Sequence, residues 1–586
     1  MFKAMLKAIR EVYSVVPVII VVFFIMGGII IAAGIATTYL TEQVIEGVQS
    51  ALDGNLSRSA LYILIAVYLV VGLLYFIANA INNFIWEFGF DQKANFVFRI
   101  RLGEHAAKLG LLNYEDSKFF DLMKLANNSV AGRKLAMSVT QLSWFVIGLG
   151  TMIGVTTVLA TFSPWLVPLA ILSCIPKLIA KIKRGKRMNW MQMKRVSEFR
   201  ELSYLWKLFL SPVHIKEMRT LGFSEFLSKR WEDTNTEVNE EIWSFNKKEA
   251  RTMFLIDLFN VLCYITGIVV SVWLVINGTI TIAQFGACIA AFLTMQASMR
   301  QFASNWAYLP VNQEHVENYF KFMNLKPNAH DNKGFEGIRD KLELRNINFK
   351  YPNTDKNALS DINLTIKKGE KIALIGENGS GKTTLSKLIL GLYPPETGNI
   401  MLDGEDIKSY DTKSFYEHFS MVSQDFVKYA LLLRENVALG DIAKLYDDAK
   451  LHSTIERASA DEVIERTGGL DGMLGREFQG TELSGGQWQK LAISRGLFKD
   501  YDFIVLDEPT SALDPIVETD IFKKFLDAMD NKTALIISHR VGLCRLADRI
   551  VVLQDGKVSE TGSHDELMAK KEHYFELFTS QQQWYV

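Results

Sequence analysis

A glycine-rich segment in the second half of the chain has the residue types and spacing of a phosphate-binding loop. It reads Gly376-Glu377-Asn378-Gly379-Ser380-Gly381-Lys382-Thr383-Thr384, after a strand-like stretch at 371–375 and before a helix-like stretch at 385–390. The glycines let backbone N–H groups turn toward phosphate, Lys382 supplies a charge to the β- and γ-phosphate oxygens, and the Thr383 hydroxyl can coordinate Mg²⁺. The following helix directs the positive end of its dipole at the same anion. We therefore predict that this loop binds a nucleotide phosphate.

A second acidic element fits the same chemistry. The apolar stretch at 503–506 is typical of a buried strand, and it ends in Asp507 and Glu508. Asp507 would hold the metal ion, and Glu508 would polarise the attacking water as the general base, because phosphoryl transfer needs little beyond positioning and charge neutralisation. An isolated Asp-Glu pair at a strand end would be incidental. Downstream of a phosphate-binding loop, the pair indicates hydrolysis.

These residues need an α/β domain to position them, and the sequence places that domain at 341–586, after a polar linker at 326–340. The first 325 residues differ in character, with a net charge of +8 against −9 for the remainder. They contain uncharged runs near or above the roughly 20 residues that a bilayer crossing needs. We predict a transmembrane domain at 1–325 with six spans, at about 15–40, 60–86, 140–162, 163–182, 252–277 and 279–305.

Lysine and arginine gather in the segment before the first span and in two long internal stretches, 87–139 and 183–251. By the positive-inside rule these segments, the N-terminus and the nucleotide domain are cytoplasmic, and the protein is a multi-pass protein of the cell membrane. Helical spacing of apolar residues in the internal stretches predicts that the spans extend into the cytosol. Each extension is expected to end in a short transverse helix, near 113–122 and 210–218.

Further motifs extend the likeness to a whole family. The segment Leu483-Ser484-Gly485-Gly486-Gln487 lies between the phosphate-binding loop and Asp507, and with it the chain resembles the ATP-binding-cassette exporters over essentially its whole length. In that family the serine-glycine motif opens a helix that caps the γ-phosphate of ATP bound to the opposing cassette. The resemblance implies adenine stacking for Tyr351, Mg²⁺ sensing for Gln424, communication across the dimer for Asp514 and γ-phosphate contact for His539.

The resemblance also implies the fold, the activity and the partners. The expected fold is a six-span α-helical exporter domain with long cytoplasmic extensions, fused to an α/β P-loop nucleotide-binding domain. The expected activity is an ATPase coupled to transport, with ATP and Mg²⁺ as cofactors. Six spans with one cassette imply half a transporter, so we expect a homodimer through both domains, with the transverse helices on the cassettes. The predicted site residues are, as catalytic groups, Glu508, His539 and Gln424; as nucleotide ligands, Tyr351, Gly376, Asn378, Gly379, Ser380, Gly381, Lys382, Thr383, Thr384, Ser484, Gly485, Gly486, Gln487 and Asp514; and as Mg²⁺ ligands, Thr383, Gln424 and Asp507.

Two cassette segments narrow the likeness to the exporters of lanthionine-bridged (nisin-type) antimicrobial peptides. They are 424–429, Gln-Asp-Phe-Val-Lys-Tyr, and 486–490, Gly-Gln-Trp-Gln-Lys, with Tyr114-Glu115-Asp116 as a weaker likeness. The expected cargo is a ribosomally made, modified peptide, with a modifying enzyme as a further candidate partner. Export of a lipid, a glycolipid or varied drugs stays open, as does import, which a few relatives of this architecture perform. No Cys/His pair precedes Val15, so we expect no leader-cleaving protease domain.

Some features argue against other functions. No predicted soluble domain is strongly basic, so nucleic acid is not expected as a partner. The cysteines are isolated, which disfavours a disulfide framework or a zinc site. Polar residues inside the spans would be costly against lipid, so they are either candidates for the transport pathway or groups paired near the cytoplasmic face. They are Asn79, Asn82, Asn83, Lys177, Asp257, Asn260 and Gln296.

Overall fold

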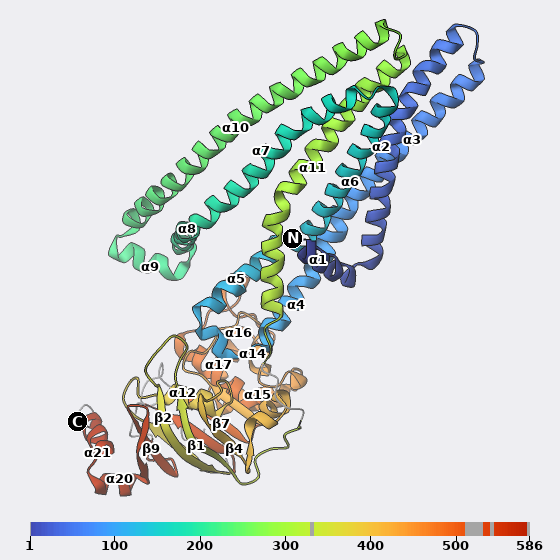
Figure 1. Ribbon diagram of the computed structural model, residues 1–586. Helices are drawn as coiled ribbons and strands as arrows, with labels where there is room; N and C mark the ends of the chain where they lie inside the picture. The colour runs from blue at the N-terminus through green and yellow to red at the C-terminus, as the bar shows by residue number, and fades with distance from the viewer. Residues whose placement is uncertain (1, 328–332, 510–530, 539–543, 583–586) are drawn as a thin grey trace. The chain divides into compact units, whose positions relative to one another are not determined.

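The computed structural model describes residues 2–327, 333–509, 531–538 and 544–582. The chain forms two compact units. The first contains Met1–Ala107 and Asp121–Leu325 and is helical (Figure 1). The second contains Lys108–Phe120 and Lys326–Val586 and holds both β-sheets. A short segment from the first half of the sequence therefore packs with the second unit.

The helical unit is built from long helices that run alongside one another. Helix α11 packs against α6, α7 and α2, and α10 packs against α7 (Figure 1). The helices are α1 (Phe2–Val15), α2 (Pro17–Leu52), α3 (Arg58–Phe84), the π-helix η1 (Ile85–Ala94), α4 (Asn95–Lys108), α5 (Ser117–Ala131), α6 (Lys134–Phe162), α7 (Leu166–Lys194), α8 (Val196–Leu210), α9 (Pro212–Leu221), α10 (Ser224–Ile276) and α11 (Ile282–Met323).

Five helical segments in the described part of the chain are long and apolar enough to cross a membrane. They are Pro17–Leu52, Arg58–Lys108, Lys134–Phe162, Ser224–Ile276 and Ile282–Met323. The predicted count of six spans is therefore not confirmed. The segment predicted at 163–182 is helical, as α7, but its apolar first part is followed by Lys177, Lys181 and Lys183, which lower the hydropathy of the helix as a whole.

The N-terminal helix α1 was not predicted. Its residues Met5, Ala8 and Val12 follow a helical spacing of three and four, and all three are buried. A helix with one buried face and basic residues on the others lies against its own protein rather than across a bilayer. The charged N-terminal segment therefore has a packed structure, and Pro17 starts the next helix at its first turn.

The second unit contains two sheets. The smaller is antiparallel, in the order β2-β1-β4-β5, and the larger has the order β10-β9-β3-β8-β7-β6, in which every neighbouring pair except β10 with β9 is parallel. The strands are β1 (Lys341–Phe349), β2 (Leu359–Lys367), β3 (Lys371–Ile375), β4 (Thr397–Leu402), β5 (Glu405–Asp406), β6 (Phe419–Val422), β7 (Phe503–Asp507), β8 (Thr533–Ile537), β9 (Arg549–Gln554) and β10 (Lys557–Gly562).

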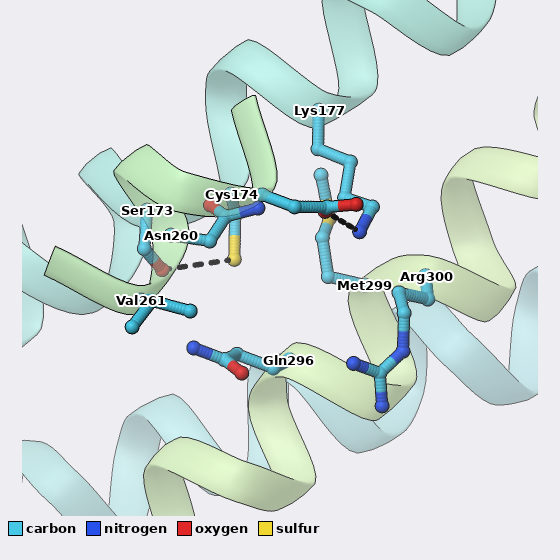
Figure 2. A pocket seen from close by; sticks show the side chains of 9 residues that line it. Ser173, Cys174, Lys177, Asn260, Val261, Gln296, Met299 and Arg300 are labelled. Carbon is cyan, nitrogen blue, oxygen red and sulfur yellow. Dashed lines mark hydrogen bonds and ion pairs between the residues drawn. The ribbon is translucent and has the colours of Figure 1, made fainter. Parts of the chain in front are cut away.

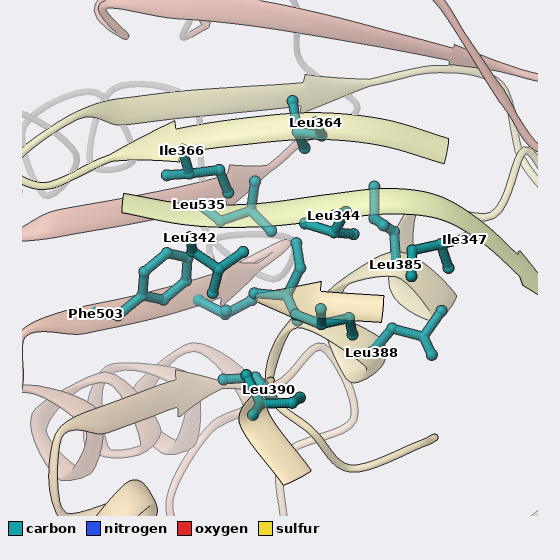
Figure 3. Packing of buried hydrophobic residues seen from close by; sticks show 14 of the residues in the cluster. Leu342, Leu344, Ile347, Leu364, Ile366, Leu385, Leu388, Leu390, Phe503 and Leu535 are labelled. Atoms are coloured by element: carbon teal, nitrogen blue, oxygen red, sulfur yellow. The ribbon is translucent and has the colours of Figure 1, made fainter. Parts of the chain in front are cut away.

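Helices cover the larger sheet, and apolar side chains fill the space between the two sheets. Figure 3 shows Leu342 and Leu344 of β1 in the same cluster as Leu385 of α12 and Leu535 of β8. Strands β7 and β8 are buried along their whole length, as expected for parallel strands covered on both faces. The helices of this unit are α12 (Lys382–Ile389), η3 (Ile407–Ser409), α13 (Thr412–Glu417), α14 (Leu433–Ala438), η4 (Ile442–Lys444), α15 (Asp448–Arg457), α16 (Asp461–Thr467), η5 (Arg476–Phe478), α17 (Gly485–Phe498), α20 (His564–Lys570) and α21 (His573–Gln582).

Candidate nucleotide site

The glycine-rich loop connects β3 to α12 at the carboxyl edge of the larger sheet. Gly376, Gly379 and Gly381 have φ values of 155°, 81° and 104°. A Cβ on Gly376 would lie 2.2 Å from the Leu553 carbonyl oxygen, so no other residue fits there without displacing β9. A Cβ on Gly379 would meet nothing within 4 Å, which leaves open space beside the loop. A Cβ on Gly381 would lie 2.9 Å from the Ala358 carbonyl oxygen, so close packing requires glycine at both Gly376 and Gly381, and the positive φ favours it at all three positions.

Lys382 begins α12 and folds back over the loop. Its Nζ donates hydrogen bonds of 2.9 Å to the carbonyl oxygens of Gly376 and Glu377. The side chain is 6% exposed, and burial lowers the pKa of its ammonium group. Two backbone carbonyls stabilise the charge, and they hold it at the mouth of the loop where a phosphate would lie.

Asp507 ends β7 at the same edge, because the carboxyl ends of parallel strands meet there. It is 1% exposed, and burial raises the pKa of its carboxyl group while a hydrogen bond with Thr383 opposes that rise. Its Oδ1 has no hydrogen-bond partner. A buried carboxylate oxygen without a partner is unfavourable, so this atom suits a metal ion.

Mg²⁺ therefore fits the residues present. Thr383 and Asp507 already contact each other, and both offer the oxygen ligands that Mg²⁺ prefers. In the described part of the chain no three His, Cys, Asp or Glu side chains form a cluster that could hold a metal. An ion at this position would share its coordination with nucleotide phosphates and water, which is the usual arrangement for Mg²⁺.

Glu508 follows Asp507 but turns in another direction. Its φ is 48°, and its backbone N–H donates to the Ile537 carbonyl oxygen at 3.0 Å. Gln424 Nε2 donates a hydrogen bond of 2.9 Å to Glu508 Oε2. A positive φ is uncommon for a residue with a side chain. At Glu508 the positive φ accompanies two adjacent carboxylates in different surroundings. Asp507 is buried beside Thr383, and Glu508 is half-buried beside Gln424.

Tyr351 lies at the first turn of α12. Its hydroxyl is 2.9 Å from the Thr384 Oγ1, and its ring meets the edge of Tyr393 at a centroid distance of 5.9 Å. This position brings the predicted adenine-stacking ring beside the phosphate-binding loop, although residues 351 and 384 are far apart in sequence.

The serine-glycine motif, 484–487, lies at the start of α17 and makes its hydrogen bonds there. Ser484 caps α17: its Oγ accepts from the Gln487 backbone N–H at 3.3 Å, and the Gln487 Oε1 accepts from the Ser484 N–H at 3.0 Å. Gln487 also accepts a hydrogen bond from Arg466. A Cβ on Gly485 would meet nothing within 4 Å. These hydrogen bonds leave the motif on an open helix terminus and do not join it to the phosphate-binding loop of its own chain.

The chain is similar to known proteins both in its cassette and over most of its length. A family model described as ABC transporter matches residues 359–511. The nisin transport ATP-binding protein of Lactococcus lactis subsp. lactis is 28% identical over 529 residues, 89% of this chain and 87% of that protein. The subtilin transport ATP-binding protein of Bacillus subtilis is 26% identical over 545 residues, 91% of this chain and 87% of that protein.

Two further matches differ in how much of the chain they cover. An ATP-dependent lipid A-core flippase of Alkalilimnicola ehrlichii is 34% identical over 363 residues, 62% of this chain and 61% of that protein. A solved structure of a bacterial Atm1-family ABC exporter with ATP bound has a TM-score of 0.78 at 20% identity, and the match covers 95% of this chain and 98% of that one. The chain thus carries an ABC transporter ATP-binding domain and has the fold of the ABC exporters, and its resemblance to the ATP-binding-cassette exporters is confirmed.

The expected exporter fold and ATPase activity are thus confirmed. This exporter carries a C-terminal ATP-binding cassette, and ATP hydrolysis there is coupled to transport. It is a membrane protein whose cassette is cytoplasmic. The roles predicted for individual site residues stay predictions. Two of them, Asp514 and His539, lie outside the described residues.

The segment Lys108–Phe120 packs with the cassette, where a transverse helix near 113–122 was expected, but the residue pairs that make the contact were not predicted. Tyr393, just beyond α12, donates a hydrogen bond to the Glu115 carboxylate, and Lys387 Nζ lies 3.1 Å from the Tyr393 hydroxyl and 3.9 Å from Glu115 Oε1. Burial raises the pKa of Tyr393, with the hydrogen bond to Glu115 as a second cause. The sequence predicted the transverse element and its place on a cassette, but not that Glu115 would contact Tyr393 and Lys387.

This segment is the first of the two predicted transverse elements. It contains the 3₁₀-helix η2 (Leu111–Glu115), followed by α5, and Leu112 packs against the core between the sheets. Asn353 Nδ2 also donates to Asp116 at 3.3 Å. The second predicted element, at 210–218, corresponds to α9 in the helical unit. Contact of α9 with a cassette stays a prediction.

Proposed function

We propose that a homodimer of this exporter moves a ribosomally made, modified peptide across the cytoplasmic membrane at the expense of ATP. One observation carries the proposal. The nisin and subtilin transport proteins align with 89% and 91% of the chain, so the likeness to them includes the membrane helices that contact cargo. Likeness confined to the cassette would give no information on cargo, because cassettes share their chemistry across the family.

The geometry supports a division of roles in hydrolysis. Lys382 and the loop N–H groups bind the β- and γ-phosphates, and Tyr351 stacks on adenine. Thr383, Asp507 and Gln424 would hold Mg²⁺, which would supply charge neutralisation to the phosphates. Glu508 orients and deprotonates the attacking water, and the hydrogen bond from Gln424 fixes its carboxylate.

The homodimer follows from the open serine-glycine motif. Ser484 to Gln487 caps its own helix and does not bond the phosphate-binding loop of the same chain. In a dimer each motif would complete the site of the other copy, and His539 and Asp514 would act there too. One cassette per chain then gives two ATP sites per transporter. A peptide-modifying enzyme docked to this dimer remains part of the proposal.

The test is a titration of ATPase rate with the full-length protein in lipid nanodiscs. A leader-bearing, lanthionine-containing peptide, a short-chain phosphatidylglycerol and a hydrophobic drug are added in separate series, and Glu508→Gln controls for contaminating ATPases. A saturable rate change with the peptide alone is expected. Uptake of the same peptide into inside-out vesicles, driven by ATP, then shows export and excludes import.

A lipid or drug substrate is the second candidate. It is favoured by the 34% identity to a lipid A-core flippase and by 32% identity to a putative multidrug export protein of Bacillus subtilis, although these matches cover 62% and 57% of the chain. Stimulation by phosphatidylglycerol or the drug, with no response to peptide, would overturn peptide export in favour of this class.

A further inference from the structure

A cavity of about 280 Å³ lies between α7, α10 and α11 in the helical unit (Figure 2). Its lining is polar for a site among apolar helices. It includes four of the span residues singled out in the sequence, Lys177, Asp257, Asn260 and Gln296, and adds Arg300. Asn79, Asn82 and Asn83 lie apart from it on α3. Three helices thus bring four of the seven polar span residues to one place, and two of these four, Lys177 and Asp257, pair with each other.

The charges of the cavity do not balance. Lys177 donates a hydrogen bond to the Asp257 carboxylate, and this ion pair neutralises both groups. Arg300 has no ion-pair or hydrogen-bond partner among the described residues. In Figure 2 its guanidinium extends toward the cavity from α11, and Lys177 enters from a different helix. The cavity therefore presents one uncompensated cation.

A second observation also indicates a missing ligand. The Asn260 Oδ1 atom is buried and has no hydrogen-bond partner. A buried amide oxygen without a partner is unfavourable, because it has lost its hydrogen bonds to water. Gln296 adds another side-chain amide to the same lining. Groups that lack partners within the protein are suited to those of a bound molecule.

We infer that this cavity binds a carboxylate of the transported peptide, with Arg300 as its ion-pair partner. The planar guanidinium presents two parallel N–H donors that match the two oxygens of a carboxylate. Asn260 and Gln296 hydrogen-bond the adjoining peptide groups. The Lys177–Asp257 pair keeps Asp257 neutralised, so that it does not repel the ligand. The inference rests on the proposed peptide cargo and identifies the part of that cargo which is recognised.

The lining favours a peptide over a lipid phosphate. Charge alone does not separate the two, because a phosphodiester headgroup and a carboxylate each carry one negative charge; the amides of the lining do. The two amides match the alternating donors and acceptors of a peptide backbone. A lipid headgroup offers few such groups.

The test compares two peptides of one amphipathic sequence. One has aspartates and a free C-terminal carboxylate, and its twin has asparagines and a C-terminal amide. Each carries a tritiated N-acetyl group, and equilibrium binding to the full-length protein in phosphatidylcholine nanodiscs is measured by scintillation proximity. We expect the acidic peptide to bind at least tenfold more tightly, which corresponds to about 1.4 kcal/mol.

Substitutions test whether Arg300 causes the difference in affinity between the two peptides. Arg300→Gln should reduce the ratio of affinities to about one while leaving the affinity for the amidated twin unchanged, and Arg300→Lys should retain part of the ratio. Arg251→Gln is the matched control, because Arg251 is an exposed cation on α10 outside the cavity. It should keep the full ratio. Unchanged binding of the amidated twin also shows that each variant is folded.

Different results would overturn the carboxylate site alone or the peptide cargo as well. Equal affinity of the unmodified protein for both peptides would overturn the carboxylate site and leave peptide export standing, without need of any variant. A tenfold ratio that survives Arg300→Gln would also overturn it. If neither peptide binds but short-chain phosphatidylglycerol does, in a way that depends on Arg300, both the inference and the peptide cargo fail, and the cavity takes a lipid phosphate instead.

Discussion

Asp507 and Glu508 are adjacent carboxylates in different environments. Asp507 is almost completely buried and contacts Thr383, whereas Glu508 is half-buried and accepts a hydrogen bond from Gln424. The positive φ of Glu508 directs the two side chains apart. A buried oxygen without a partner suits a metal ion, and a half-buried carboxylate that accepts a hydrogen bond from Gln424 suits a water molecule.

Glu508→Gln tests this division. The substitution keeps the size and polarity of the side chain but removes the base. We expect ATP turnover to fall by about 10²- to 10⁴-fold, which is the usual contribution of a general base. The affinity for ATP should change little, because the phosphate contacts come from Lys382 and the loop. Phosphate release and equilibrium ATP binding measure the two effects.

Asp507→Asn is the matched comparison for that experiment. It should weaken Mg²⁺-dependent ATP binding itself, because it alters the proposed metal ligand. Near-normal turnover in Glu508→Gln would remove Glu508 from the role of general base, and the assignment of the two carboxylates would then have to be reversed or abandoned.

Helix α12 links the phosphate-binding loop to the segment Lys108–Phe120. Its first residue, Lys382, crosses the loop, and near its other end Lys387 and Tyr393 contact Glu115. The Tyr351 ring touches Tyr393 as well, at 5.9 Å between centroids. The predicted adenine and phosphate contacts and the transverse segment therefore share neighbours around one short helix. A displacement of α12 on binding ATP would act directly on Glu115, which follows α4 in the chain.

Tyr393→Phe tests that link. It removes the hydroxyl that donates to Glu115 and keeps the ring that stacks on Phe349 at 5.4 Å. Loss of one such hydrogen bond costs about 1–2 kcal/mol. We expect ATP affinity to stay nearly constant and cargo stimulation of the ATPase to fall severalfold, measured in nanodiscs with saturating cargo.

Tyr446→Phe is the control for Tyr393→Phe, because Tyr446 is an exposed tyrosine of the same unit, at 81% exposure. It should leave both ATP affinity and cargo stimulation unchanged. Full cargo stimulation in Tyr393→Phe would show that the contact with Glu115 does not transmit the effect of nucleotide.

Among the helices, strands and loops, the sequence predicted those whose residues form a contiguous pattern. The loop, its strand and its helix were assigned because their residues are contiguous, and the strand ending at Asp507 because it is wholly apolar. The contact of Glu115 with Tyr393 was not, because 278 residues separate them and each is an ordinary polar residue by itself. The span at 163–182 stays a prediction: its apolar start continues past Lys177 into a basic helix, which is not among the five segments long and apolar enough to cross a membrane in the described part of the chain.

Arg300 shows a related limit. Residues 258–299 carry no charge, and Arg300 is the first charged residue after them. In the sequence it therefore indicated the end of an apolar run and gave no sign of a binding site. The cavity became apparent only when α7, α10 and α11 were packed together. Helix pairing in the membrane half depends on contacts that hydropathy does not record, so the polar residues were identified but their grouping was not.

At the scale of the whole molecule, the proposed homodimer depends on where the serine-glycine motif lies. The loop, Asp507, Glu508, Gln424 and Tyr351 gather in one chain, whereas Ser484 caps an open helix terminus elsewhere in the unit. If each motif completes the site of the other copy, a dimer has two sites, each built from both chains. If the sites were complete within one chain, the open motif would have no nucleotide to cap.

A mixed dimer distinguishes these arrangements. One copy carries Lys382→Ala and the other Ser484→Arg, each with its own affinity tag, so that tandem purification isolates dimers containing one of each. In sites shared between copies, one site of the mixed dimer carries both lesions and the other carries neither. It should therefore occlude one ATP per dimer, measured with labelled nucleotide after rapid gel filtration, while each singly substituted homodimer occludes none. Sites contained within one chain would leave a lesion in both, so absence of occlusion in the mixed dimer would contradict the shared arrangement.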